Sequence, residues 1–371
     1  MPDHKNREHA LLSASSAHRW LACPPSAVAA EIYPDQDTEF TRDGTLAHEV
    51  AECVASGKTY DASADREMVE CAEGYAAYIQ EQVTSPDAVV LLEQRVDFSP
   101  WVPDGFGTCD CIILQGDDMT IIDYKYGQGV AVSADNNPQM MLYALGALND
   151  YGIAYDIRRV HMHIYQPRIN NISSATIDAD AMMRWAEGIV KPTAALAAKG
   201  EGDYSAGEHC RFCPHAGRCR ELTKVCSEFV ETHDLRVAVP VLSPTEVADV
   251  LRMESLISLW LKKVKAQAMT TLMDGGEIPG YKVVEGRLGN RTWTDELAVA
   301  QALKDAGYQI NDITETKLLS PAAMDKSIGK TRVTELLEGL ISRSPGAPTI
   351  VPETDKRPAI DRIAEAQKDF E

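Results

Sequence analysis

The chain has 371 residues, 44% of them hydrophobic and 25% charged, a balance typical of globular proteins that fold in water. No apolar run approaches the about 20 residues of a membrane-spanning helix, and residues 1–5 do not begin a secretory signal, so we expect a cytoplasmic protein without a membrane partner. The formal charge of −20 argues against a general nucleic-acid coat protein. It does not exclude an enzyme that meets nucleic acid through bound cations.

Hydrophobic periodicity predicts a mixture of helices and strands over the first 200 residues. The expected elements are helices at 44–57 and 64–82, strands at about 88–97, 106–115 and 118–125, a helix at 136–149, a strand at 156–166 and a helix at 180–199. The core order is then α-β-β-β-α-β, and the fold class is α/β.

A cysteine-rich segment at residues 203–226 precedes a change in composition, so we expect one domain over 1–232 and a second, α+β domain over 233–371. Ser243, Pro244 and Glu246 predict the capped start of a long helix that ends near Asp274. Beyond that helix we expect three further features: a small hairpin at 281–285 and 291–293, a helix capped by Thr294 or Asp295, and an extended Pro-rich tail at 342–357.

Two aspartates and a lysine meet in the predicted hairpin of strands 106–115 and 118–125. Gly116-Asp117 suits a two-residue type II′ turn, which pairs residues whose numbers sum to 233 and sets Asp110 opposite Asp123. Lys125 lies two residues further along the same strand face. Two carboxylates beside a lysine predict a metal site with a charged helper. Taken without the register, Asp123 and Lys125 could equally be an ion pair at a strand end.

Asp110, Asp123-x-Lys125 and Gln139-x-x-x-Tyr143, preceded by a helix that carries His48, resemble the motifs of the PD-(D/E)XK nucleases. The nearest branch is that of the RecB-like exonucleases and the CRISPR-associated adaptation nucleases. The whole chain also resembles an uncharacterised phage family built on this core, through segments 20–23, 280–282 and 355–358.

This resemblance implies a restriction-endonuclease-like core and a metal-dependent deoxyribonuclease, an exonuclease that serves phage DNA processing or recombination. Mg²⁺ or Mn²⁺ would be held by His48, Asp110 and Asp123. Lys125 would orient water or stabilise charge, and Gln139 and Tyr143 would position DNA or Lys125. The implied partners are DNA, a phage recombination or single-strand-annealing protein and further copies of the chain. A catalytically silent nuclease fold that binds DNA or protein is the alternative.

Cys210-x₂-Cys213-x₅-Cys219 is a compact ligand set that needs a fourth member. Cys226 is near in sequence, and spacing alone leaves a structural Zn²⁺ site and an iron–sulfur cluster equally open. The pattern of a distant Cys23 joined to these three resembles the [4Fe–4S] cluster of AddB-type nucleases, and it implies a staple between the N-terminal segment and the end of the nuclease domain. His209 or His215 could replace one ligand if the metal is zinc.

Basic residues are concentrated in the C-terminal part. Residues 233–371 hold 18 Lys and Arg against 21 Asp and Glu, a net charge of −3, so residues 1–232 carry the remaining −17. A DNA-gripping surface is therefore expected in the C-terminal part or on a partner protein. The candidates for phosphate contact are Lys262, Lys263, Lys265, Arg287 and Arg291. A solvated helix face and hairpin would explain these residues equally well.

Overall fold

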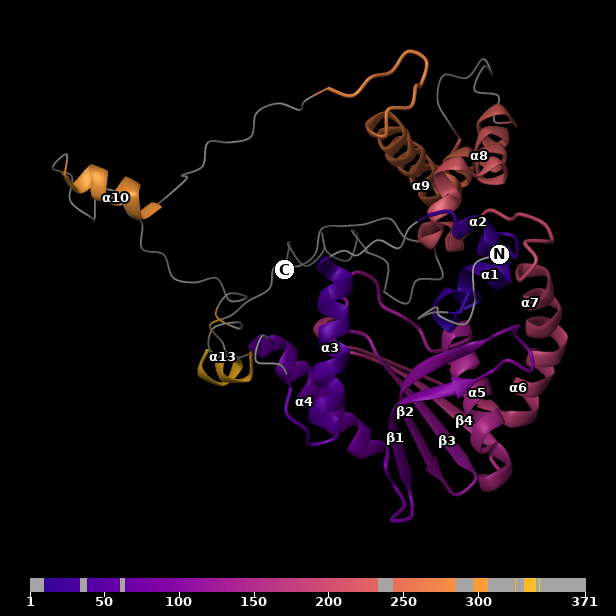
Figure 1. The fold of residues 1–371 in the computed structure, drawn as a ribbon, viewed down its shortest axis with the longest axis vertical. Helices are drawn as coiled ribbons and strands as arrows, with labels where there is room; N and C mark the ends of the chain where they lie inside the picture. The colour runs from indigo at the N-terminus through magenta and orange to yellow at the C-terminus, as the bar shows by residue number, and fades with distance from the viewer. Residues whose placement is uncertain are drawn as a thin grey trace, which may run out of the picture. The chain divides into compact units, whose positions relative to one another are not determined.

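A computed structural model describes residues 10–33, 39–60, 64–232, 243–284, 296–305, 324, 330–337 and 340. The chain divides into two compact units, Met1–Glu315 and Thr316–Glu371. Helix α13 (Lys330–Leu336) belongs to the second unit, and every other element below belongs to the first. The first unit has a mixed α/β fold in which a five-stranded sheet lies between helices (Figure 1).

The strands follow one another across the sheet in chain order: β1 (Val89–Asp97), β2 (Phe106–Gln115), β3 (Asp118–Tyr124), β4 (Arg159–Gln166) and β5 (Asn171–Asp178). Neighbours are antiparallel except β3 and β4, which are parallel and are joined by α5 (Pro138–Tyr155). The pairs from Gln115↔Asp118 to Cys111↔Ile122 sum to 233, as predicted. Gly116 has φ +62, as the first position of a type II′ turn requires. Strand β5 was not predicted.

Helices cover both faces of the sheet (Figure 1). On one face lie α3 (Glu39–Ala55) and α4 (Arg66–Gln82), which share a core with Ile122 and Tyr124. On the other lie α5, α6 (Ala179–Trp185), a π-helical turn (Ala186–Val190) and α7 (Lys191–Ala197), which share a core with Ile112 and Ile121. The single helix expected at 180–199 is therefore interrupted by the π-helical turn, which continues directly into α7.

The N-terminal segment folds into the turn Ala14–Ser16 and the short helices α1 (Ala17–Ala22) and α2 (Ser26–Ala30). Leu12 and Trp20 are fully buried in the core that α5 covers, and Trp20 Nε1 donates to the Ser13 carbonyl oxygen at 3.1 Å. This segment is thus anchored by apolar burial as well as by any bond that Cys23 makes.

The cysteine segment forms two 3₁₀ turns, Glu208–Phe212 and Pro214–Arg218, followed by α8 (Arg220–Thr232). Helix α9 (Pro244–Met273) starts at the predicted capping box of Ser243 and Glu246. It packs against the second turn and α8, with Leu256 and Trp260 against the cysteine cluster. The predicted domain boundary at 232/233 therefore differs from the boundary of the compact units at 315/316, because α9 completes the core of the cysteine segment.

Helix α10 (Glu296–Asp305) lies where a helix capped by Thr294 or Asp295 was expected. The caps at 294 and 295, most of the predicted hairpin and the tail at 342–357 lie outside the described residues. Of the helices that the structure describes, none combines the length and apolarity that crossing a bilayer requires.

Candidate metal centre

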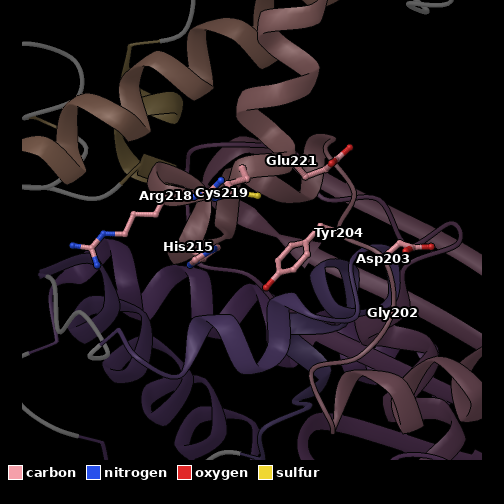
Figure 2. Close-up of a pocket in the computed structure, with 8 residues that line it drawn as sticks. Gly202, Asp203, Tyr204, His215, Arg218, Cys219 and Glu221 are labelled. Carbon is pink, nitrogen blue, oxygen red and sulfur yellow. The ribbon is translucent and has the colours of Figure 1, made fainter.

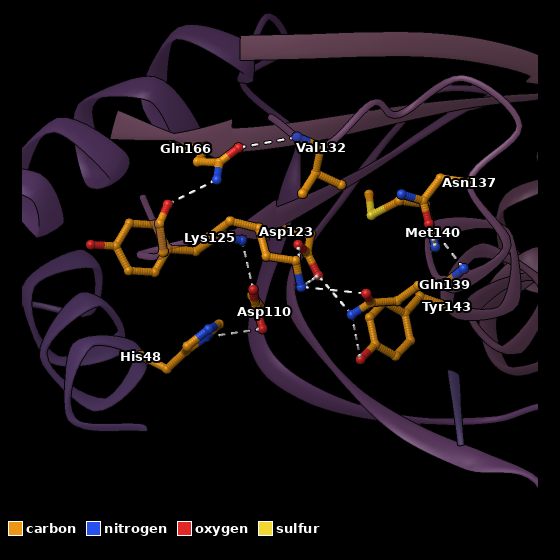
Figure 3. A network of polar contacts seen from close by, with 12 residues as sticks. His48, Asp110, Asp123, Lys125, Val132, Asn137, Gln139, Met140, Tyr143 and Gln166 are labelled. Carbon is orange, nitrogen blue, oxygen red and sulfur yellow. Dashed lines mark hydrogen bonds and ion pairs between the residues drawn. The ribbon is translucent and has the colours of Figure 1, made fainter. Parts of the chain in front are cut away.

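The residues predicted to bind metal come from the middle of β2 (Asp110), the end of β3 (Asp123) and helix α3 (His48) (Figure 3). Asp110 and Asp123 are the next residues on each strand after the last ladder pair, Cys111↔Ile122. Cys109 and Cys111 are buried in different cores, although residues two apart on a strand normally share a face. The alternation of faces therefore breaks at Asp110, and this break lets its carboxylate meet α3.

Helix α3 delivers His48 to Asp110. His48 Nδ1 lies 3.4 Å from Asp110 Oδ1, and Asp110 Oδ2 accepts a hydrogen bond from the Tyr124 backbone N–H at 2.7 Å. Burial acts to lower the pKa of His48, but the carboxylate of Asp110 outweighs it and the pKa is raised. The imidazole and the carboxylate thus form a paired donor set at the strand end.

Glu93 on β1 completes this set and was not predicted. The β1–β2 pairs on either side of it, Leu92↔Cys111 and Gln94↔Cys109, leave Glu93 facing Asp110 with no inserted residue. Its φ of +46 is left-handed, which costs a non-glycine residue about 1–3 kcal/mol. Ligand atoms of His48, Glu93 and Asp110 all lie within 4.8 Å of one another. Burial, followed by the negative charge of Asp110, raises the pKa of Glu93 to about 7.

Asp123 belongs to a second group of contacts, toward α5. Its carboxylate lies 3.0 Å from Lys125 Nζ and accepts a hydrogen bond from Gln139 Nε2 at 3.2 Å. Gln139 Oε1 accepts from Lys125 Nζ at 3.4 Å, and Gln139 Nε2 also contacts Tyr143 Oη at 3.3 Å. Burial raises the pKa of Asp123, whereas Asp123 raises the pKa of Lys125 against the effect of burial. At 3.0 Å, the Lys125 ammonium and the Asp123 carboxylate form a buried ion pair.

Local sequence explains why these side chains are held in place. Asn137 caps α5, accepting hydrogen bonds from the backbone N–H groups of Gln139 and Met140, and Pro138 occupies the first helical turn. This cap fixes the start of the helix that presents Gln139. Gln166, buried at the end of β4, accepts from the Val132 backbone N–H and donates to the carbonyl oxygen of Gly127. It thereby braces the connection between Lys125 and α5 (Figure 3).

Gly107 makes room for Tyr143, because a Cβ at residue 107 would lie 2.7 Å from Tyr143 Cε1. We expect Gly107→Ala to displace that ring and to lower the free energy of unfolding by about 1–3 kcal/mol, as overpacking does. Urea denaturation measures the change. Gly127→Ala is the matched control, since a Cβ there would meet nothing within 4 Å. Equal stability of the two variants would contradict this packing argument.

The four cysteines predicted as cluster ligands line one small cavity. Cys23 from the end of α1 joins Cys210, Cys213 and Cys219 there. Cys226 is fully buried outside this cavity, with its thiol 4.0 Å from the Leu256 carbonyl oxygen. Burial raises the pKa of the Cys213 thiol, and the nearby Arg19 guanidinium acts against that rise. The chain thus brings together thiols that are nearly 190 residues apart in sequence.

The chain belongs to the family described as "Protein of unknown function (DUF2800)", whose model matches residues 9–358. Among solved structures, the chain is similar to one titled "Crystal structure of SSO0001", with 13% sequence identity and a TM-score of 0.30. That match covers 59% of this chain and 90% of the other.

Proposed function

We propose that this protein is a metal-dependent deoxyribonuclease with a PD-(D/E)XK core, an exonuclease that acts in phage DNA processing or recombination. The observation that carries the proposal is the convergence of six motif residues from four elements at one sheet end. Two distinct contact networks connect them, His48 with Asp110 and Lys125 with Asp123, Gln139 and Tyr143. A catalytically silent member of the fold would have no need of a lysine beside a buried aspartate, since burial of such a pair is costly.

The donor atoms suit a divalent cation. His48, Glu93 and Asp110 offer one imidazole nitrogen and two carboxylate groups within 4.8 Å, a mixed set that suits Mn²⁺ and also accommodates Mg²⁺. The left-handed backbone of Glu93 brings a second carboxylate toward Asp110, an arrangement that a cation would stabilise. Asp123, from the opposing strand, would complete the ligands. A bound cation would supply an activated water and relief of negative charge on the phosphate.

The remaining residues would act on the proton and the developing charge. Lys125, fixed between Asp123 and Gln139, would hold its ammonium group near the attacked phosphate and stabilise the negative charge that develops on it. Gln139 spans Asp123 and Tyr143, so it would keep the lysine in that position. His48 would serve as a nitrogen ligand in its neutral form.

For the cysteine cavity we propose a structural [4Fe–4S] cluster. Cys23, Cys210, Cys213 and Cys219 line one cavity, and four thiolates are the ligand set that such a cluster uses.

Digestion of end-labelled linear DNA and of closed circular DNA, each with Mg²⁺ or Mn²⁺, tests the function. We expect metal-dependent degradation of linear DNA while circles persist. Cutting of circles would indicate an endonuclease instead. Binding of DNA without any cleavage in either metal would contradict the enzyme and favour a silent binding module.

Glu93 gives a sharper test of the metal site. We expect Glu93→Gln to weaken Mn²⁺ binding about tenfold or more, measured by calorimetric titration, because it removes an anionic ligand beside Asp110. Glu93→Gly should weaken binding similarly and leave the fold intact, since glycine accepts φ +46 readily. The matched control is Glu52→Gln on α3, whose carboxylate pairs with Lys58 at 3.0 Å. Unchanged Mn²⁺ affinity in both Glu93 variants would remove this residue from the site.

A further inference from the structure

Two hollows open beside the cysteine segment and share Arg218. One, of about 730 Å³, lies where Arg19, Phe212, Arg218 and Lys263 from α1, the cysteine turns and α9 come together; we call it the α9 hollow. The other, of about 760 Å³, is lined by residues 202–204, by His215 and by residues 218–221 (Figure 2). Both are of the size that binds organic ligands.

The α9 hollow is positively charged although the chain as a whole carries −20. Arg19, Arg218 and Lys263 line it against one carboxylate, that of Asp274. Within the part of the chain that the structure describes, none of these three cations forms an ion pair. Arg19 also lies near Cys23 and Cys213, so the positive charge that is left for a ligand is that of Arg218 and Lys263.

The partners that these cations do have are neutral. Arg19 donates to the Ser26 carbonyl oxygen, and Lys263 Nζ donates to the Cys213 carbonyl oxygen at 3.4 Å. Arg218 Nη2 donates to the Gln267 amide oxygen at 2.9 Å when that amide is oriented to satisfy both groups. Such bonds orient the three side chains and do not cancel their charge.

Aromatic rings accompany these cations. Phe212 is 72% exposed at the end of the turn between Cys210 and Cys213, so the cysteine ligands would fix its position. Tyr33 also lines this hollow, and the ring of His215 lies edge-on to it at a centroid distance of 6.0 Å and tilted against Tyr204 at 6.3 Å. An exposed phenyl ring among unpaired cations is a combination suited to unstacked bases and their phosphates.

We propose that the α9 hollow binds single-stranded DNA, with Arg218 and Lys263 on phosphates and Phe212 stacked on a base. A duplex hides its base faces, so it would use the cations alone. The biological role of this site would be to hold one DNA strand for cleavage, and that role rests on the proposed nuclease function. Single-stranded DNA offers both negative phosphates for the cations and planar bases for Phe212. The acidic side chains of a protein offer negative charge but no planar rings.

The test measures binding of a labelled oligothymidylate of about 15 nucleotides, within the range that one site covers. The full-length protein carries Asp123→Asn, so that cleavage does not interfere, and the iron and zinc content of each variant is determined. We expect Phe212→Ala to weaken binding about tenfold, the loss of one stacked base. Arg218→Gln should weaken it similarly and reduce the slope of log affinity against log salt by about one. Phe212→Ala should leave duplex binding unchanged.

Controls are Tyr60→Ala, an exposed ring between α3 and α4, and Arg158→Gln, an exposed arginine paired with Asp156. Unchanged oligonucleotide affinity in Phe212→Ala and Arg218→Gln, with normal metal content, would overturn the proposal. Displacement of the oligonucleotide by polyglutamate, equally from the parent and from Phe212→Ala, would overturn it in favour of an acidic protein partner. Weakened binding in a chain whose unmutated form cleaves no DNA would support the hollow and contradict only the nuclease.

Discussion

Asp123→Asn and Lys125→Met are each expected to reduce DNA cleavage about a thousandfold or more, measured as the single-turnover rate on end-labelled linear DNA at saturating Mn²⁺. Asp123 contacts both Lys125 and Gln139. Loss of its charge would therefore remove a proposed metal ligand and also release the Lys125 ammonium group from its ion pair. Removing a single charge-stabilising group commonly costs a factor of about 10²–10³, and here two functions share one network.

The choice of substitution matters because this pair is buried. Asp123 is 2% exposed, and truncation of either partner to alanine would leave an unpaired charge at a cost of about 3–5 kcal/mol. Asparagine and methionine leave the same partner charge unpaired, but they retain most of the side-chain volume, so they add no cavity to that cost. Thermal denaturation of both variants shows whether they remain folded at the assay temperature, which separates lost chemistry from unfolding.

The control is Asp118→Asn at the other end of the same strand. Asp118 pairs with the half-exposed Arg159 at 2.7 Å, and exposed pairs contribute little to stability. We expect full cleavage activity in that variant. Cleavage by Asp123→Asn at the rate of Asp118→Asn would remove the proposed activity from this site.

The register of Asp110 and Asp123 could be predicted because a two-residue turn leaves no freedom. Gly116 takes the positive φ that the turn requires, and the position of the turn then fixes which residues of β2 and β3 pair. Glu93 could not be found in the same way. Eight residues, 98–105, separate β1 from β2, so no turn type fixes which residue faces Asp110. The one local signal was a carboxylate directly after the apolar run Val89–Leu92, which alone predicts only an exposed strand position.

Strand β5 escaped prediction because its sequence does not alternate in hydrophobicity. Asn171–Asp178 contains two serines and a threonine, and its one large apolar residue at an outward position, Ile172, is 56% exposed. Backbone pairing with β4 at the sheet edge decides its conformation, and pairing of that kind leaves little trace in side-chain pattern. The capping box of α9, in contrast, is a local hydrogen-bond device, so its residues could be read directly from the sequence.

Cys23→Ala is expected to remove the iron of the anaerobically purified protein as completely as Cys213→Ala does. The unmutated protein should contain about four irons per chain and absorb broadly near about 400 nm, as a Cys-ligated [4Fe–4S] centre does. Both residues line the same cavity, although Cys23 belongs to the N-terminal segment. Cys226→Ala should retain the iron, because the Cys226 thiol faces the Leu256 carbonyl oxygen of α9.

Loss of the cluster should loosen only part of the N-terminal segment. Leu12 and Trp20 remain buried in the main core. Residues 24–33 reach that core through the small side chain of Ala27 and touch the cysteine segment through few polar contacts, among them Tyr33 with His215 at 3.3 Å. Limited proteolysis of Cys23→Ala should therefore cut within 24–33 and spare the residues before Trp20. Zinc in place of iron would contradict the cofactor and retain the link through Cys23. His209 and His215 also line the cavity and could replace a lost thiolate. Iron retained at full content in Cys23→Ala, and again when His209→Ala and His215→Ala are added to it, would therefore contradict the link itself.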